Sequence, residues 1–361
     1  MFTWLRKHNE RITSPVLDWV QIEVTTHCNA ACIYCPHTLA GKRWQSGHFP
    51  LPLFHDLLPS LSHTYLVFLQ GWGEPLLHPN LFEMVRLCKK QNKMVGFTTN
   101  GLLLNKENIH TIIDLQLDIL GVSFAGTIPS THNRIRKGTD FDTVVAALEY
   151  LRRIKAEKKT TKPAVHLAYL MLASNFDELS RITRLAKNVG AEQVVASNLT
   201  LIQEPQLSQE ALFNNPLRHN EYSRTLTRIK KEAADNNILF AYRGPALDET
   251  SCVCPENVCR ACVINMAGEV GPCVFTNPIL SGSPGKTADK QMVAIFNDQP
   301  IPFETFSFGN IKDSGLSQIW QNKKYREFRK LFNPETRLAA KEILAGMPSS
   351  CITCYKRLLS S

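Results

Sequence analysis

Residues 27–36 read HCNAACIYCP and place three cysteines, Cys28, Cys32 and Cys35, in a C-x3-C-x2-C spacing. Three thiols make an incomplete ligand set, because a structural zinc ion or an iron–sulfur cluster usually takes four protein ligands. A loop with these spacers can wrap three corners of a 4Fe–4S cubane, which leaves one iron for a ligand from outside the protein. A zinc ion completed by a histidine beside the loop is the alternative that the spacing leaves open.

The cysteine loop follows the first of six short apolar runs that alternate with helix-like segments. The runs span residues 21–27, 65–71, 94–100, 117–125, 164–172 and 191–199. Strand–helix alternation is typical of parallel βαβ units, and six units are fewer than the eight of a closed barrel. We therefore predict an α/β fold in which residues 21–245 form a partial (β/α)6 TIM barrel after an N-terminal extension over residues 1–20.

Three further motifs stand where the second, third and fourth of these strands end. They are GWGEP at 71–75, TTNG at 98–101 and SFAG at 123–126. The carboxyl ends of parallel strands meet at one edge of the sheet, so we expect these motifs to face the same mouth as the cysteine loop. The stretch THNRIRKGTDFD at 131–142 follows the fourth strand, and its Arg134 and Arg136 could reach this mouth to bind a carboxylate or phosphate. A solvated loop is equally consistent with that stretch.

In this order and at these strand ends, the motifs resemble the radical S-adenosylmethionine (radical SAM) superfamily over roughly residues 20–200. The resemblance implies an enzyme of the oxidoreductase type in which Cys28, Cys32 and Cys35 hold a catalytic 4Fe–4S cluster. The amino and carboxylate groups of SAM would chelate the fourth iron. Reductive cleavage of SAM would then give a 5′-deoxyadenosyl radical that abstracts hydrogen from a substrate, while the protein supplies binding, orientation and exclusion of water.

The resemblance also implies a set of residues that bind the cofactor: Tyr34, Gly71, Gly73, Glu74, Asn100 and Ser123. Tyr34 matches the family's aromatic residue beside the adenine, and Glu74 would meet the ammonium group. Asn100 and Ser123 are candidate partners for the carboxylate and the ribose. Trp72 departs from the family's GGEP pattern, so its bulk could point towards the sheet or into the substrate space.

The composition changes after residue 245, because seven of the eleven cysteines lie between residues 250 and 361. The spacing of Cys254, Gly268 and Cys273, followed by CITC at 351–354, resembles the auxiliary-cluster domain called SPASM or its shortened twitch form. We therefore predict a small cysteine-rich domain over residues 246–361. The resemblance implies an auxiliary 4Fe–4S cluster with four thiolate ligands: Cys254, Cys273, Cys351 and Cys354.

Three cysteines of this region have no assigned role. Cys252, Cys259 and Cys262 could ligate a cluster, donate a hydrogen atom to a product radical, or be small buried hydrophobic residues. Outside the region, Cys88 stands among apolar neighbours in a helix-like segment and is predicted to lie in the core.

Composition and charge limit the class of protein and its partners. No apolar run approaches the ~20 residues of a membrane span, and no secretory signal precedes the first strand, so a reducing cytoplasm is expected. The net charge is +9 and the pI about 9.0. This balance favours an acidic partner, and we predict a small electron donor such as a flavodoxin or ferredoxin. The substrate, a peptide or protein side chain or a small biosynthetic metabolite, is not encoded in these patterns.

A second interpretation is a zinc-binding protein that interacts with nucleic acid and has no radical chemistry. In it, His27 or His37 would complete the first thiol set, and the basic pI would serve binding. The sequence has no basic stripe interleaved with aromatic residues and no recognised reader motif, which disfavours nucleic acid as a partner.

Overall fold

The computed structural model describes residues 17–280, 292–333, 335 and 338–359. Among these residues, nine strands form one sheet in the order β11-β10-β1-β3-β4-β5-β7-β8-β9. Seven of the strands precede residue 245: β1 (Leu17–Ile22), β3 (Thr64–Phe68), β4 (Met94–Thr99), β5 (Ile119–Phe124), β7 (Ala164–Met171), β8 (Gln193–Asn198) and β9 (Leu239–Tyr242). Every neighbouring pair from β10 to β9 is parallel, and β11 is an antiparallel edge strand. The predicted α/β partial barrel is confirmed, because this sheet does not close on itself within the described residues.

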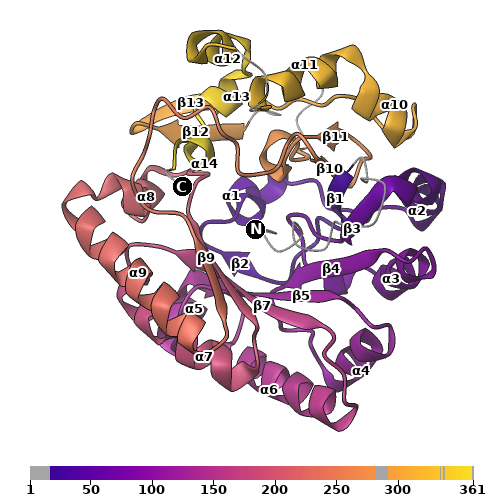
Figure 1. The fold of residues 1–361 in the computed structure, drawn as a ribbon, viewed down its shortest axis with the longest axis vertical. Coiled ribbons are helices and arrows are strands. Elements are labelled where there is room, and N and C mark those ends of the chain that lie inside the picture. The colour runs from indigo at the N-terminus through magenta and orange to yellow at the C-terminus, as the bar shows by residue number, and fades with distance from the viewer. Residues whose placement is uncertain (1–16, 281–291, 334, 336–337, 360–361) are drawn as a thin grey trace.

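Helices cover the outer face of the curved sheet (Figure 1). They are α2 (Leu51–Leu57), α3 (Leu81–Lys90), α4 (Lys106–Asp114), α6 (Phe141–Glu157), α7 (Ile182–Val189) and α9 (His219–Asp235). α3 buries Leu81, Met84, Val85 and Cys88, which share one helical face, so Cys88 is a core residue as predicted. The α6 helix begins after Asp140, whose carboxylate accepts a hydrogen bond from the Thr143 amide at 2.8 Å.

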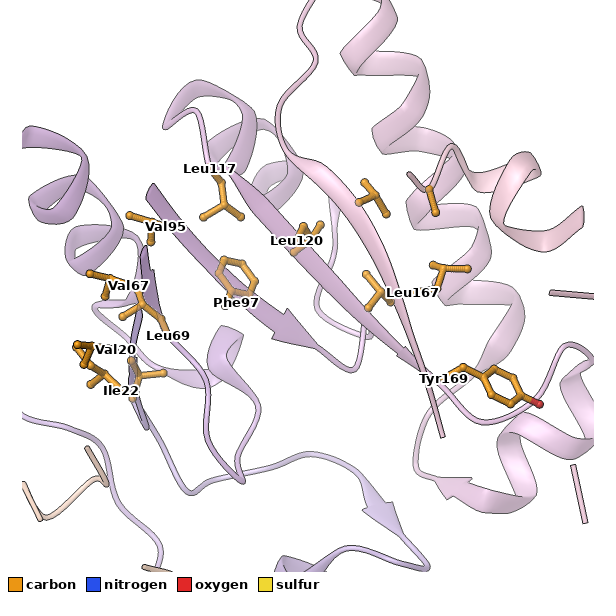
Figure 2. Close-up of a cluster of buried hydrophobic side chains, with 14 of the residues drawn as sticks. Val20, Ile22, Val67, Leu69, Val95, Phe97, Leu117, Leu120, Leu167 and Tyr169 are labelled. Carbon is orange, nitrogen blue, oxygen red and sulfur yellow. The ribbon is translucent and has the colours of Figure 1, made fainter. Parts of the chain in front are cut away.

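The main hydrophobic core fills the space between the sheet and these helices. Alternate strand residues point into it, among them Val20 and Ile22 of β1 and Val95 and Phe97 of β4 (Figure 2). Side chains on successive strand positions face opposite sides of a sheet, so the intervening residues line the inner face. Each fully buried aliphatic or aromatic side chain contributes about 1.5–3 kcal/mol to folding, and this layer holds the strand ends in place.

Short elements shape the mouth of the barrel at the carboxyl ends of the strands. They are β2 (Ala31–Cys32), α1 (Pro36–Ala40), α5 (Pro129–Ile135), β6 (Arg136–Lys137) and α8 (Pro205–Ser208). β2 and β6 pair antiparallel, with Cys32 opposite Arg136. The loop after β1 is thereby tied to the loop after β5, so two segments about a hundred residues apart meet at the mouth.

The C-terminal region continues the barrel sheet. β10 (Ala261–Ile264) pairs with β1 in parallel, and β10 forms a hairpin with β11 (Val270–Gly271). Gly268 in the turn has a φ of +93°, a conformation that favours glycine. A second hairpin, β12 (Met292–Phe296) with β13 (Gln299–Phe303), lies with the C-terminal helices at the top of Figure 1. These helices are α10 (Leu316–Gln321), α11 (Lys323–Phe332), α12 (Ala340–Gly346), α13 (Ser349–Ile352) and α14 (Tyr355–Leu358).

The predicted boundaries differ from the observed elements at two places. The first strand spans Leu17–Ile22 rather than 21–27, so it starts within the range expected for the N-terminal extension, and residues 1–16 lie outside the described residues. At the other boundary the sheet runs on past residue 245 through β10, so the division at 245/246 stays a prediction. No helix in the described part of the chain is long and apolar enough to cross a bilayer.

Candidate functional site

The first cysteine site, defined as Cys28, Cys32 and Cys35, is built by local backbone hydrogen bonds. The Cys35 amide donates to the Cys32 carbonyl at 3.1 Å, which closes a tight turn between the two thiols. Cys35 is also the residue before α1, and its carbonyl accepts from the Thr38 amide at 2.9 Å. One turn therefore positions the Cys32 and Cys35 thiols, and Cys28 lies in the loop that follows β1.

The Cys28 and Cys35 thiols lie close enough to Cys32 for its charge to raise their pKa. Burial raises the pKa of Cys28, and burial with the neighbouring Cys32 raises the pKa of Cys35 to about 12. Such thiols stay protonated at neutral pH unless a bound cation compensates the thiolate charge, and metal binding then releases their protons. The site therefore fits a group that brings positive charge to all three sulfurs.

A single zinc ion does not fit this arrangement. Zn–S bonds of about 2.3 Å would bring the ligand sulfurs within about 4 Å of one another. Across the described ranges, no group of three or more His, Cys, Asp or Glu side chains could hold one metal ion. This weighs against the zinc interpretation at both cysteine sites, including His27 or His37 as a fourth ligand.

The GWGEP loop packs so closely against neighbouring residues that no Cβ fits at Gly71 or Gly73. A Cβ on Gly73 would lie 2.4 Å from the Thr25 carbonyl oxygen and 2.5 Å from that of His27. These contacts are with backbone, which cannot move aside as a flexible side chain would. A Cβ on Gly71 would lie 2.2 Å from a carbon of the Glu23 side chain. Glycine is required at both positions by close approach of the chain.

Glu74 ties three segments of the mouth together. Its buried carboxylate accepts hydrogen bonds from the Thr99 hydroxyl at 2.6 Å, the Asn100 amide at 2.7 Å and the Leu76 amide at 3.1 Å. Its own amide donates to the His27 carbonyl at 2.8 Å. Burial raises the pKa of Glu74, although the hydrogen bonds oppose this. Glu74 thus fixes the relation between the cysteine loop and the end of β4.

The other residues expected to bind the cofactor also lie at this mouth. The Asn100 side chain donates to Asn29 at 2.7 Å, next to Cys28. Ser123 is half-buried near the end of β5. Tyr34 is half-buried, and its hydroxyl accepts a hydrogen bond from the Arg136 guanidinium. The structure therefore brings together every residue of the predicted cofactor set, while their individual roles stay predictions.

Arg136 is a buried cation beside the first cysteine site. From the sequence alone, a position in a solvated loop was equally consistent with residues 131–142. Arg136 is only 8% exposed. Burial lowers the pKa of Arg136, but Tyr34 and the three thiols outweigh this and raise it. Its Nε is buried without a hydrogen-bond partner, and its charge lowers the pKa of the buried Glu74 carboxyl nearby. A buried guanidinium with a spare donor fits an incoming carboxylate.

Trp72 points towards the C-terminal region rather than into the sheet. Its ring stacks on Phe275 with 5.8 Å between centroids and 16° between planes. Its amide donates to Glu23 Oε1 at 3.0 Å, and Glu23 Oε2 accepts from the Met266 amide at 3.1 Å. Burial raises the pKa of Glu23 to about 7. Sequence patterns did not single out Glu23, although a carboxylate inside the apolar run QIEV is an available signal.

The second cysteine site, defined as Cys254, Cys273, Cys351 and Cys354, surrounds one cavity. All four thiols line it together with Phe275, Ser350 and Lys356. Burial raises the pKa of each thiol, to about 12 for Cys273. The Ser350 hydroxyl is buried there without a partner. A cavity with four thiols and a spare hydroxyl fits a closed cluster with a hydrogen-bond donor on its wall.

A paired cation stands beside this second site. Lys356 Nζ lies 2.8 Å from Glu256 Oε1, with the side chains 25% and 23% exposed, and 4.3 Å from the centroid of the Phe275 ring. Burial lowers the pKa of Lys356, but Glu256 outweighs this and raises it. Neither residue belonged to the predicted site, although both stand two residues after a predicted ligand.

The three unassigned cysteines lie apart from the cavity wall. Cys262 is fully buried in β10, and the Cys259 thiol donates to the Arg329 carbonyl at 3.5 Å. The Cys252 thiol donates to the Thr250 carbonyl at 3.6 Å near the surface. Their positions favour Cys254 as the ligand from this stretch.

The family comparisons agree with this geometry. Residues 22–188 match the radical SAM superfamily, and residues 252–355 match SPASM, an iron–sulfur cluster-binding domain. Residues 22–188 therefore form a radical SAM domain, and residues 252–355 form a C-terminal SPASM domain. The chain is an enzyme whose first domain implies a 4Fe–4S cluster and SAM as cofactors, and whose second domain implies auxiliary iron–sulfur binding.

Individual relatives are similar over most of their length. The chain is 25% identical over 319 residues to the tungsten-containing aldehyde ferredoxin oxidoreductase cofactor-modifying protein of Pyrococcus furiosus, covering 87% of this chain and 83% of that one. It is 24% identical over 343 residues to the mycofactocin maturase MftC of Mycobacterium tuberculosis, covering 91% and 74%. The structure of Streptococcus suis SuiB bound to SAM matches with a TM-score of 0.63 at 13% identity, covering 98% and 74%. At this identity, the likeness to SuiB shows the fold alone.

Proposed function

We propose that this enzyme cleaves SAM reductively at a 4Fe–4S cluster held by Cys28, Cys32 and Cys35. A cluster held there would supply the electron for cleavage of the S–C5′ bond of SAM, and the 5′-deoxyadenosyl radical released with methionine would abstract hydrogen from the substrate. In this proposal the protein binds and orients SAM, with Glu74 as a partner for its amino group and Arg136 as a partner for its carboxylate. A second 4Fe–4S cluster at Cys254, Cys273, Cys351 and Cys354 assists.

One observation carries this proposal. The first cysteine site combines three thiols with a buried guanidinium whose Nε has no hydrogen-bond partner among the described residues. An anionic chelating ligand would complete both the ligand set and the charge. The amino and carboxylate groups of SAM are such a ligand.

The substrate proposed is a peptide or protein side chain or a small biosynthetic metabolite. The relatives support both, since one is named a cofactor-modifying protein and another a maturase. The positive net charge supports an acidic electron donor of the flavodoxin or ferredoxin type. A reducing compartment, the cytoplasm, would keep all eleven cysteines out of disulfides, and none of them forms a disulfide in the structure.

Counting irons in cysteine variants tests the proposal. Anaerobically reconstituted wild type should hold about eight irons, and the Cys28→Ala/Cys32→Ala/Cys35→Ala variant about four. That variant should form no 5′-deoxyadenosine with dithionite and SAM. The Cys351→Ala/Cys354→Ala variant should also lose about four irons but still cleave SAM, and Cys252→Ser should match wild type.

Two results would contradict the proposal. One is a colourless protein that contains only zinc after anaerobic purification. The other is equal 5′-deoxyadenosine formation by wild type and the triple cysteine variant. Adding cell extract to the assay would identify metabolites or peptides that change mass only with wild type.

A further inference from the structure

The outer surface of α11 carries a dense set of positive charges. Its sequence is KKYREFRKLF, and the exposed residues Lys323, Lys324, Arg326 and Lys330 define what we call the basic face of α11. Glu327 is the one exposed acidic residue of this helix. Such a surface attracts acidic proteins and steers their approach at low ionic strength.

The inner surface of the same helix forms part of the second cysteine site. Phe328 and Phe332 line the cavity beside the four thiols. Their rings lie 5.0 Å apart, and Phe328 also contacts Phe308 at 5.1 Å. Aromatic side chains thus fill the space between the helix backbone and the cavity. A helix with its side chains is only about 10–12 Å across, so a protein docked on the basic face would lie one helix away from the cavity.

Another basic helix shows that charge alone does not make this arrangement. α9 exposes Arg224, Arg228 and Lys231 at comparable spacing. Its inner residues, including Tyr222 and Leu226, pack into the main hydrophobic core and line no cysteine cavity. The combination of a basic outer surface and a thiol-lined cavity beneath it belongs to α11.

We propose that the basic face of α11 docks a small acidic electron-carrier protein that exchanges electrons with the cluster of the second cysteine site. This rests on the proposed function, since it needs a cluster in that cavity. In the transfer, the reduced carrier loses one electron and the oxidised cluster gains it, with no bond made or broken and no proton moved. The carrier therefore has its own entry point, away from the mouth where SAM and substrate bind.

A charge-reversal variant and a matched control test the docking. The test variant is Lys323→Glu/Arg326→Glu/Lys330→Glu on α11, and the control is Arg224→Glu/Arg228→Glu/Lys231→Glu on α9, so both lose the same charge. Binding of purified flavodoxin to each reconstituted enzyme would be measured by thermophoresis at low and at physiological salt. We expect the α11 variant to bind at least about tenfold more weakly at low salt, and the control to bind as wild type does apart from a small uniform loss.

A kinetic measurement reports the electron transfer itself. In the Cys28→Ala/Cys32→Ala/Cys35→Ala background only the second site holds a cluster, so stopped-flow bleaching by reduced flavodoxin follows that cluster alone. Adding the α11 substitutions should slow the bleaching about tenfold or more, and adding the α9 substitutions should not. Equal binding and equal bleaching in the two sets would overturn the docking proposal.

Other outcomes separate the possible occupants and the two proposals. Loss of binding to vesicles of anionic phospholipid or to RNA, with flavodoxin binding unchanged, would overturn the carrier in favour of that partner. If wild type cleaves SAM with dithionite but the α11 variant binds flavodoxin normally, only the docking is wrong. If wild type fails to cleave SAM with dithionite, the proposed function fails.

Discussion

The two cysteine sites differ in the number of thiols, and they differ in the same way in the pairing of the cation beside them. The first site has three thiols and Arg136, a buried cation whose Nε lacks a partner. The second has four thiols and Lys356, a cation already paired with Glu256 at 2.8 Å. A site that lacks one ligand and has a spare guanidinium donor can accept a chelator that carries a carboxylate, whereas a site with four thiols and a paired cation favours a permanently bound group.

The two cysteine sites differ by more than the number of their thiols. A missing thiol could have been replaced by a nearby histidine or carboxylate, but no such set converges at the first site among the residues described. The two sites are also joined, because Glu23 holds both Trp72 of the first mouth and Met266 of the C-terminal hairpin.

The largest effect is expected from Gly73→Ala. The new Cβ would meet backbone oxygens at 2.4 and 2.5 Å, so the GWGEP loop must move away from the cysteine loop. SAM cleavage should fall by about a hundredfold or more, as expected when a misplacement of about 1 Å disturbs positioning. The irons of the second site should remain. Assays of 5′-deoxyadenosine together with iron counts check this.

Gly315→Ala is the matched control for Gly73→Ala. A Cβ there meets nothing within 4 Å, and the residue precedes α10, where alanine costs no more than about 1 kcal/mol. Normal SAM cleavage by Gly73→Ala would show that the close packing of the first mouth is dispensable.

The next effect is a pH dependence from Glu23. Its pKa is raised from 4.5 to about 7 in the fold, so its contribution to stability is fully present below pH 4.5 and is lost as pH rises towards 7. The loss amounts to roughly 3 kcal/mol for a shift of this size. Glu23→Gln removes the titration. The free energy of unfolding of the variant, relative to that of wild type, should therefore rise by roughly 3 kcal/mol between pH 4.5 and 8. Denaturant unfolding at several pH values measures this, and parallel pH profiles would show that Glu23 does not titrate as proposed.

A smaller effect should distinguish the two buried cations. Lys356→Met leaves Glu256 without its partner and should cost roughly 2 kcal/mol of stability, less than a fully buried pair because both side chains are partly exposed. Arg136→Met strands no paired carboxylate, so its cost to stability should be smaller, while its affinity for SAM should fall about tenfold. Thermal unfolding and SAM binding by calorimetry measure both quantities. Adding Glu256→Gln to Lys356→Met should restore part of the stability. A loss of SAM affinity in Lys356→Met would contradict the assignment of the two cations to different roles.

The smallest effect is expected from Ser350→Ala. The hydroxyl is buried on the wall of the second site without a partner, so it can donate to the cluster or to a thiolate. Hydrogen bonds to the sulfurs raise the reduction potential, so the variant should have a slightly lower potential. Redox titration followed by electron paramagnetic resonance measures it. Ser349→Ala is the control, because Ser349 donates to Glu304 at 2.7 Å on the surface, and an equal shift in both variants would argue against a role for Ser350.

Much of the barrel could be predicted from the sequence, because strand runs and strand-end motifs are local signals. The six predicted strands all occur, with the first displaced towards the N-terminus. Trp72 could not be placed, because its direction depends on Phe275, some two hundred residues away. Cys259 and Cys262 likewise could not be distinguished from Cys254 by sequence, because Cys262 is placed by the pairing of β10 with β1 and Cys259 by its hydrogen bond to the Arg329 carbonyl.

The sequence by itself named the candidate ligands of both sites: C-x3-C-x2-C brings three thiols together through one short loop, and the resemblance to SPASM supplied the four C-terminal thiols. Their roles as ligands stay predictions. Only the tertiary structure decided the charge at each site. Arg136 reaches the first thiols because β6 pairs with β2, and Lys356 is neutralised because the chain after Cys354 returns to Glu256. These pairings join segments about a hundred residues apart, which no local pattern encodes.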